Sequence, residues 1–432
     1  MPQFGPYRRS MCTLTAASPQ HGTRHDCTAH ATKQRAGTPR GRIVSGPLAL
    51  VFLAEFCALT SFYLLLSVTP MYAAADGAGS TGAGLVTGVL LLGTVAAELA
   101  APILMRRFGY WALLLTGAML LGLPALALLP GGSLALIVTV SVIRGFGFGL
   151  CTVMTGALTA ALLPPERRGE GLGLFGVVAT APGIVALPAG VWLAGHAGMA
   201  TVAGLTAAAA LVPLAAFPWL SGRAGRRKAE APRAGTTRPD GLRAGLRRAG
   251  QLRLFLIFAA STVAGGVVVS FVPLAVGVSG NVAVAGLLAQ ALTATISRWW
   301  AGRRGDRAGH AGLLVPALAI ASLGMITMIW LASPAAVIVG MCLFGTGFGI
   351  CQNATFALMI DRMPPAGAGT ASALWNLAYD AGYGAGPAVF GVAVIHTGYP
   401  AAFALTAVLM LAALPAARRE RSGGLSSGRR GG

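Results

Sequence analysis

The sequence predicts an all-α membrane protein of twelve transmembrane helices, arranged as two parallel six-helix bundles. Three observations support this prediction. Hydrophobic residues make up 55% of the 432-residue chain and charged residues only 10%, whereas a soluble domain carries roughly 25% charged residues. The hydrophobic residues occur in long runs, and a run of about 18 is long enough to cross the hydrocarbon core. Finally, the two halves of the chain repeat each other.

The run lengths predict where each span begins and ends, to within about four residues. The twelve expected spans are 46–71, 83–105, 111–130, 134–163, 170–195, 199–220, 252–278, 282–303, 311–332, 334–362, 367–395 and 398–417. They give an N-terminal bundle over 46–220 and a C-terminal bundle over 252–417, joined by a flexible cytosolic linker loop over 221–251. Residues 1–45 are expected to be a disordered cytosolic tail, and residues 418–432 a second cytosolic tail.

The positions of the basic residues predict the orientation of the spans. All but Arg144 and Arg298 of the 32 Lys and Arg residues lie in the two tails, in the linker, in the connections after spans two, four, eight and ten, or within two residues of these segments. Because positive residues collect on the cytoplasmic side, we expect a multi-pass protein of the cell inner membrane with both termini in the cytosol. The same placement accounts for the net charge of +20. We therefore expect the lipid bilayer, and no nucleic acid, as a partner.

An internal repeat relates the two halves at a constant offset of 200 residues. The matching segments are 147–151 with 347–351, 163–165 with 363–365, and 196–198 with 396–398. Each half has six spans, so both halves begin on the same side and are related by an axis along the membrane normal. Transporters with such parallel repeats bind substrate near the bilayer midplane, between the halves. The linker would allow the halves to rock against each other.

A loop motif between spans eight and nine identifies a family resemblance. Residues 302–309 read Gly-Arg-Arg-Gly-Asp-Arg-Ala-Gly. Over residues 46–417 the chain resembles the major facilitator superfamily, whose loop motif matches here at Gly302, Asp306, Arg307 and Gly309. The resemblance implies that Asp306 and Arg307 hold a cytosolic gate by pairing with helix ends and nearby charges. The equivalent segment after span two departs from the motif, because Pro102 and Arg106 replace the Gly and the Asp.

Looser motifs resemble the drug:proton antiporter branch of that family. In span four, Arg144 is followed by three alternating glycines, which resembles an Arg motif linked to proton coupling. Spans five and eleven carry Gly-Pro patterns at Gly183, Pro188, Gly190, Gly386 and Pro387. The alternative for most of these small residues is a packing role, because they let helices approach closely.

Ionisable residues inside the bilayer are the first candidates for function, because their burial is costly. Glu55 in span one and Asp380 in span eleven are candidate proton or substrate sites. A carboxylate that changes neighbours between inward- and outward-facing states can load and release a proton. Arg144 is a further functional candidate, and the alternative for it is a structural ion pair.

Other polar residues at membrane depth extend the candidate site. Glu98 is included, although pairing with Arg106 or Arg107 is its alternative. Arg298 lies within two turns of the interface, so we expect its side chain to extend to the surface. The uncharged candidates that could line a cavity or bridge helices are Gln352, Asn353, Asn376 and Tyr379.

The sequence contains no catalytic or metal-binding constellation, and it lacks the Gly-Lys-Ser/Thr loop that cradles nucleotide phosphates. We therefore expect neither an enzyme nor a bound cofactor. The leading hypothesis is a secondary active transporter of a small molecule, with proton-coupled efflux by alternating access, acting as a monomer. A facilitator or a proton symporter of a sugar or metabolite is the main alternative. A membrane-embedded receptor or enzyme is the alternative from another class.

Overall fold

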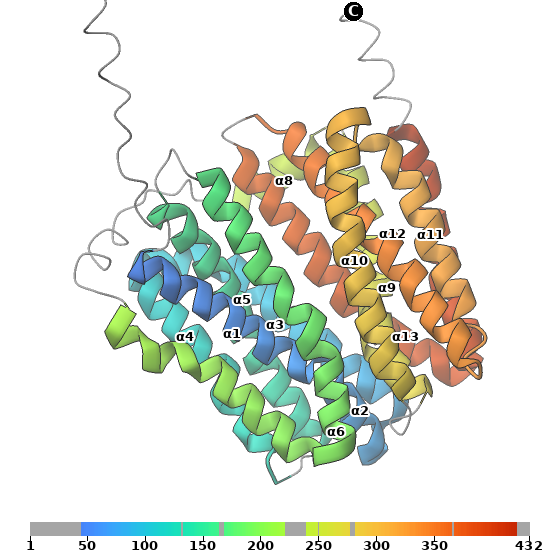
Figure 1. The fold of residues 1–432 in the computed structure, drawn as a ribbon, viewed down its shortest axis with the longest axis horizontal. Helices are drawn as coiled ribbons and strands as arrows, with labels where there is room; N and C mark the ends of the chain where they lie inside the picture. The colour runs from blue at the N-terminus through green and yellow to red at the C-terminus, as the bar shows by residue number, and fades with distance from the viewer. Residues whose placement is uncertain are drawn as a thin grey trace, which may run out of the picture. The chain divides into compact units, whose positions relative to one another are not determined.

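The structure is a computed structural model that describes residues 45–130, 133–163, 168–220, 239–248, 250–276, 281–364 and 367–420. Helices account for nearly all of this part of the chain, and no strand occurs in it (Figure 1). The described residues belong to one compact unit. The expected N-terminal tail lies outside the described residues up to position 44.

The helices follow the expected spans closely. The first half contains α1 (Gly46–Leu66), α2 (Val68–Ala73), η2 (Ala74–Ala78), α3 (Gly79–Phe108), α4 (Tyr110–Gly122), η3 (Leu123–Leu128), α5 (Leu134–Leu162) and α6 (Arg168–Leu220). The second half contains α8 (Pro239–Arg247), α9 (Gln251–Val276), α10 (Asn281–Ala308), η5 (Ala311–Leu313), α11 (Leu314–Thr327), α12 (Pro334–Asp361) and α13 (Ala368–Ala412).

These helices supply the twelve crossings. Eight apolar helical runs in the described residues are long enough to cross a membrane, and three of them, of 63, 44 and 52 residues, contain non-helical kinks. Since about 20 residues cross the hydrocarbon core, each of these three runs provides two crossings. The shorter apolar helix Ala311–Thr327 provides the ninth span.

Four glycines mark the sharp turns between spans and display the internal repeat. Gly109 and Gly309 follow spans two and eight, with φ of 80° and 83°. Gly198 and Gly398 divide α6 and α13, with φ of 79° and 73°. Glycine adopts this left-handed region at little steric cost. Each pair is separated by 200 residues, so the sequence repeat corresponds to a structural repeat.

Glycines in spans four and ten make the same close helix contacts in the two halves. A Cβ atom on Gly145 would lie 1.9 Å from the carbonyl oxygen of Leu90, and one on Gly345 would lie 2.4 Å from that of Gln290. The members of each pair are again 200 residues apart. The absence of a side chain therefore lets α5 contact the backbone of α3, and α12 that of α10. This packing role explains the first of the glycines that follow Arg144.

The helices pack as two sets with matching internal contacts. In the first half α6 packs on α1, and α5 packs on α3 and α4. In the second half α13 packs on α9, and α12 packs on α10 and α11 (Figure 1). The halves meet where α3 packs on α13 and where α6 packs on α10. These four helices therefore form the main contacts between the halves.

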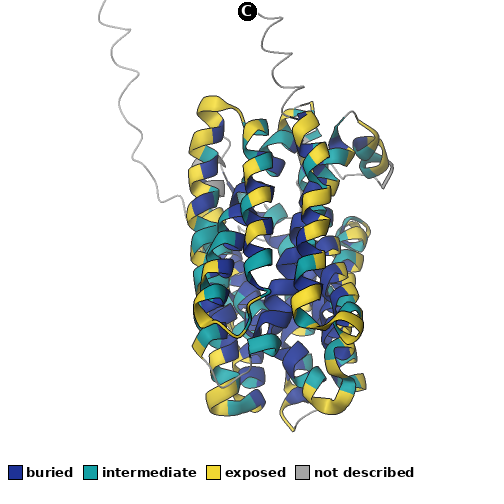
Figure 2. Cartoon of the chain, turned by 90° about the vertical axis from the view of Figure 1, so that its right-hand side faces the viewer, coloured by how far each residue is buried: buried dark blue, intermediate teal, exposed yellow. Residues whose placement is uncertain are grey.

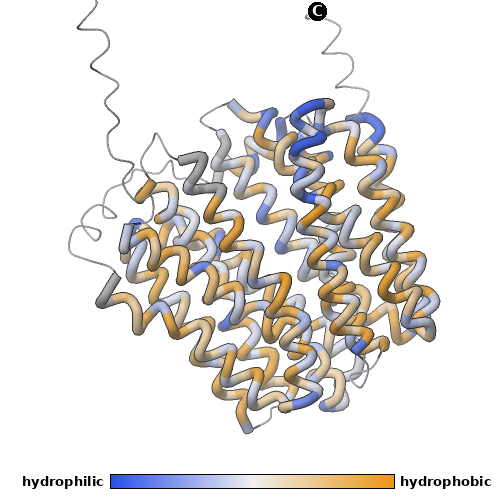
Figure 3. Tube along the Cα trace, viewed as in Figure 1, coloured by the Kyte–Doolittle hydropathy of each residue, from blue (hydrophilic) through white to orange (hydrophobic). Residues whose placement is uncertain are grey.

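Hydropathy varies along and across the bundles as a bilayer requires. The described part of the chain is largely hydrophobic along the helices, and hydrophilic segments gather at the upper end of α10 and α11 in Figure 3. We call this the basic end, because Arg107 of α3 and Arg303 and Arg307 of α10 lie there. Large apolar side chains are exposed, including Leu92 at 67% and Val389 at 70%. Figure 2 shows that exposed residues run along the outer faces of the helices. These faces suit contact with lipid.

The structure differs from expectation at the linker and at the C-terminal tail. The expected linker loop lies outside the described residues up to position 238, but its last part forms the helix α8. The final helical run continues to Glu420, beyond the expected tail boundary. The buried Glu420 carboxylate forms an ion pair with Arg253, at 3.0 Å, and with Arg362. This buried pairing connects the basic ends of α9 and α12 to the last helix.

Candidate functional site

Three connected cavities lie between the two halves. The central cavity has a volume of about 580 Å³, a side cavity between α6 and α10 has about 210 Å³, and a third of about 610 Å³ extends to the basic end. Tyr63, Arg298 and Tyr379 line both the central and the side cavity. Glu98 and Asn376 line both the central and the third cavity. The central and third cavities each have the size of a pocket for a drug-sized organic molecule, and the side cavity extends the central one.

The two halves contact each other closely at the end opposite the basic end. The Ser80 hydroxyl donates a hydrogen bond to the Gly391 carbonyl at 2.8 Å, and the hydroxyls of Thr87 and Ser270 lie 2.9 Å apart. Leu242 of α8 lines the third cavity together with residues of α3, α5 and α13. The site is thus closed at one end, while the chain of cavities leads toward the basic end.

Aromatic side chains form much of the cavity wall. On α13, the rings of Tyr379 and Tyr383 are stacked with centroids 5.3 Å apart, and Trp375 lies 5.8 Å from Tyr379. On the opposite side, the rings of Phe62 and Phe148 stack at 3.9 Å. All five residues line the central cavity. Flat faces of this kind suit a ligand with an aromatic ring, because offset stacking adds to apolar burial.

A pair of carboxyl groups connects the halves within the central cavity. Glu98 on α3 and Asp380 on α13 share a side-chain hydrogen bond, and both line the cavity. A carboxylate only accepts hydrogen bonds, so one of the two groups must carry a proton when they bond to each other. The structure does not show the alternative in which Glu98 pairs with Arg106 or Arg107. Glu98 instead contacts Asp380 of the other half.

Glu55 lies in the same cavity but has a different partner. The Thr155 hydroxyl of α5 donates to Glu55 Oε2 at 2.5 Å. The equivalent residue of the repeat, Thr355, instead accepts a hydrogen bond from Trp375 Nε1 at 3.2 Å. The carboxylate of Glu55 is buried, with 5% of the residue exposed. The threonine thus supplies the hydrogen bond that this carboxylate accepts within the described part of the chain.

Arg144 is held by backbone carbonyls and does not line any of the three cavities. Its guanidinium donates to the Leu121 carbonyl at 2.6 Å and to the Ser61 carbonyl at 3.0 Å. Leu121 lies where α4 tightens into η3, and Ser61 lies in α1. The side chain therefore ties three spans of the first half together. At the equivalent position of the second half the chain has the fully buried Phe344.

We expect Arg144→Met to destabilise the protein, because two buried carbonyls lose a charged donor. Each such hydrogen bond contributes about 1.5–3 kcal/mol, and relief of the cost of burying the charge offsets part of the loss, so a decrease of about 2–4 kcal/mol in the free energy of unfolding is expected. Thermal unfolding in detergent measures this decrease. The matched control is Arg298→Met. An equal loss of stability in both variants would contradict the structural role of Arg144.

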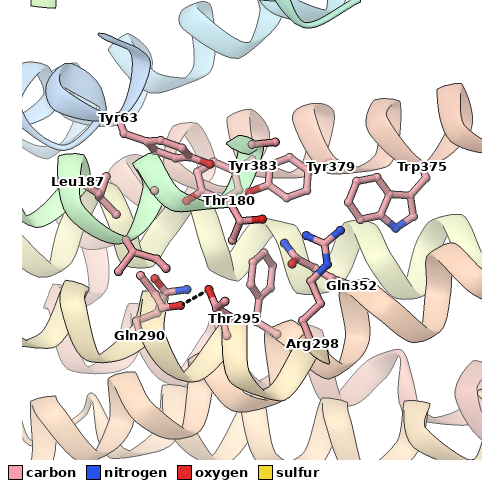
Figure 4. Close-up of a pocket in the computed structure, with 16 residues that line it drawn as sticks. Tyr63, Thr180, Leu187, Gln290, Thr295, Arg298, Gln352, Trp375, Tyr379 and Tyr383 are labelled. Carbon is pink, nitrogen blue, oxygen red and sulfur yellow. Dashed lines mark hydrogen bonds between the residues drawn. The ribbon is translucent and has the colours of Figure 1, made fainter. Parts of the chain in front are cut away.

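Arg298 does not extend to the membrane surface, so that sequence-based expectation is wrong. The side chain points from α10 into the side cavity, toward Gln352 (Figure 4). It also lines the central cavity. Run length located Arg298 near the end of a span, but the rotation of a helix about its axis depends on its neighbours. The packing of α10 on α12 and α6 directs this residue inward.

The four uncharged candidates lie at different places in the structure. Gln352 and Tyr379 line the side cavity, and Asn376 lines the central and third cavities. Asn353 lines none of the three and lies beside Gly302 of α10, where a glycine Cβ would be 3.4 Å from its Nδ2. Two further tyrosines of the cavity wall were not identified from the sequence. The only signal for them was that each is an aromatic residue at membrane depth. They are Tyr63 and Tyr383.

The loop motif lies at the basic end, away from the cavities. Gly309 adopts a φ of 83° at the end of α10, which makes the turn that the motif requires. The Asp306 carboxylate is 78% exposed and lies 3.9 Å from His310 in the same loop. Arg307 is exposed as well. In the described residues the motif therefore makes no pairing with the other half in this state.

The Gly-Pro residues lie at helix contacts. A Cβ on Gly190 would be 2.2 Å from the Leu64 carbonyl, and one on Gly386 would be 2.2 Å from the Val263 carbonyl. Gly183 faces the ring of Tyr63, and Pro188 is buried within α6. The carbonyl of Pro387 lies against Gly84 of the other half. These residues shape the walls of the site by close packing.

Comparison with known proteins agrees with this architecture. The sequence profile described as the Major Facilitator Superfamily matches residues 51–387. No curated protein sequence gives a significant match to this chain.

Among solved structures, the nucleoside transporter NupG superposes with a TM-score of 0.68 at 12% identity, covering 87% of this chain and 98% of that one. A bacterial homolog to human lysosomal transporter Spinster, in an inward-facing and occupied conformation, gives 0.70 at 16% identity, covering 87% and 96%. A POT family transporter in complex with a thioalcohol-conjugated peptide gives 0.67 at 14%, covering 86% and 94%. At these identities the likeness extends to the fold alone. With most of its length matched by the family profile, the chain belongs to the major facilitator superfamily of membrane transporters.

Proposed function

We propose that this chain is a proton-coupled secondary transporter that exports a small organic molecule by alternating access, as drug:proton antiporters do. In this proposal the basic end faces the cytosol and the protein resides in the cell inner membrane. The distribution of Lys and Arg supports this orientation. The present conformation is then inward-facing, with the cavities ready to receive cargo from the cytosol.

The single observation that carries the proposal is the hydrogen-bonded pair Glu98 and Asp380. The two carboxyls belong to opposite halves, and they line the cavity between them. When the halves rock apart on one side and together on the other, the distance between α3 and α13 must change along their length. A proton that both carboxyls hold in one state is held by only one of them in the other state. The pair therefore couples protonation to the conformational change.

The test is proton movement in proteoliposomes that contain pyranine, a pH-sensitive dye. The compounds to screen are ethidium, tetraphenylphosphonium, naphthoate, uridine and glucose, each with and without an imposed pH gradient. We expect one class of compound to drive proton flux in the opposite direction to its own. Flux in the same direction would instead establish a symporter, and flux without any proton movement a facilitator. Either result, or no response to the screen, contradicts the proposal of antiport.

The proposed orientation predicts the accessibility of two matched cysteine variants. Ala332 and Ala308 are both exposed, at opposite ends of the second half. In a background that lacks the native cysteines, Ala332→Cys should react with a membrane-impermeant maleimide added to intact cells, and Ala308→Cys should react only after lysis. Ser80 is less suitable, because its hydroxyl is bonded to Gly391. The reverse labelling pattern would invert the topology.

A further inference from the structure

We propose that Arg298 anchors the anionic group of the transported molecule, and that this molecule is an aromatic carboxylate. The proposal rests on the proposed transport function and assigns its substrate class. It begins with the position of the guanidinium, which lines the central and the side cavity at once. A group that reaches the boundary of both cavities contacts a ligand in either of them.

Among the described residues, the side cavity around Arg298 is lined by polar groups and by no acidic residue. Its neighbours in the side cavity are neutral hydrogen-bonding groups, among them Gln290, Thr295 and Gln352 (Figure 4). In the described residues no carboxylate lies within ion-pair distance of Arg298. A cation at membrane depth is costly without a partner. A ligand anion would remove this cost, and the neutral groups would complete its hydrogen bonds.

The carboxyl groups of the central cavity are already engaged elsewhere. Glu98 and Asp380 bond to each other, and Glu55 accepts from Thr155. In the described residues none of these carboxyl groups forms an ion pair with Arg298, and we call the cavity wall around Arg298 the cationic region. A cationic ligand at these carboxyl groups would compete with the shared proton, whereas an anion finds a separate site at Arg298.

Aromatic faces lie next to the cationic region. Tyr379 and Tyr383 present rings within 8° of parallel, and Trp375 is inclined by 36° to Tyr379. All three residues line the same side cavity as Arg298. A flat ring can stack on these faces while its carboxylate forms a two-pronged contact with the guanidinium. The combination selects an aromatic ring that bears an anionic group.

Binding of three probes with one ring and three head groups tests this assignment. The probes are naphthoate, naphthamide and naphthylmethylamine, which are anionic, neutral and cationic at neutral pH. The full chain in lipid nanodiscs is titrated by calorimetry, without any gradient. We expect naphthoate to bind roughly tenfold or more tightly than the amide, and this preference to disappear in Arg298→Gln, because a buried charge pair is lost. Arg298→Lys should retain part of the preference.

The control is Arg303→Gln, on the same helix but exposed at the basic end, where its guanidinium lies 4.0 Å from the ring centroid of Trp299. It should leave the preference for naphthoate intact. Tightest binding of the amine, unchanged naphthoate binding in Arg298→Gln, or no binding of any probe would overturn the assignment. The binding measurement needs no proton gradient, so its outcome is independent of the antiport test. A transporter could fail in proton coupling and still bind the anion through Arg298.

Discussion

Replacing Asp380 with Asn is expected to abolish transport driven by a pH gradient while leaving exchange without a gradient. The amide fills the same space, but it cannot bind and release the proton that Asp380 shares with Glu98. Glu98→Gln should give the same result. We expect a decrease of roughly tenfold or more in gradient-driven flux, as for loss of a functional ionisable group in a membrane. Pyranine-loaded proteoliposomes measure it, with the compound that gives the largest flux in the unmodified protein.

Two comparisons make this prediction specific. Asp361→Asn removes an exposed carboxylate at the basic end of α12 and should leave gradient-driven flux unchanged. The double variant of Glu98 and Asp380 should lose no more flux than either single variant, because the pair acts as one unit. If both single variants retain gradient-driven flux and Glu55→Gln loses it, then Glu55 carries the proton and the pair does not.

The second large effect is expected from Gly84→Ala at the contact between the halves. A Cβ on Gly84 would lie 2.1 Å from the Pro387 carbonyl oxygen, so α3 and α13 could not approach as they do here. The variant should populate the present conformation less and transport roughly tenfold more slowly, because the packed contact is lost. Spin labels at Ala75 and Ala332, which are exposed at the closed end of the two halves, should report a longer distance.

Gly145→Ala is the matched control, because it introduces the same methyl group inside one half. Its Cβ would lie 1.9 Å from the Leu90 carbonyl, where α5 packs on α3. This substitution should lower thermal stability, by about 1–3 kcal/mol for overpacking, and leave the label distance unchanged. If Gly84→Ala lowers stability equally and does not change the distance, the contact at Gly84 serves folding and not the conformational equilibrium.

Much of the fold could be predicted because its signals are local. Spans were placed within a few residues wherever an apolar run was bounded by charges or by a turn glycine, as at Gly109 and Gly309. The helical run to Glu420 was missed, because its polar end resembles a tail and only the folded structure brings the buried Glu420 carboxylate to Arg253 and Arg362. That pairing joins residues distant in the chain, which run lengths do not reveal.

The candidate site was less predictable, because it depends on which way each helix faces. Glu98 is a candidate from the sequence with pairing to nearby arginines as the alternative, and in the structure it contacts Asp380 of the other half. Arg298 was expected at the surface and lies in the cavity wall. Arg144 was a functional candidate, and the structure gives it two backbone carbonyls in its own half. Each outcome depends on helix rotation, which neighbouring helices determine.

The order of residues along the chain was enough to specify the twelve spans, their grouping into two repeated halves and the uneven distribution of basic residues. These features follow from the thickness of the bilayer and from local turn chemistry, which act on consecutive residues. The meeting of Glu98 with Asp380, and the place of Arg298 beside aromatic rings in a cavity, emerged only when the helices were packed together. The reason is that close helix contacts through glycines such as Gly84 and Gly145 fix rotation and separation, and these contacts join residues far apart in the chain.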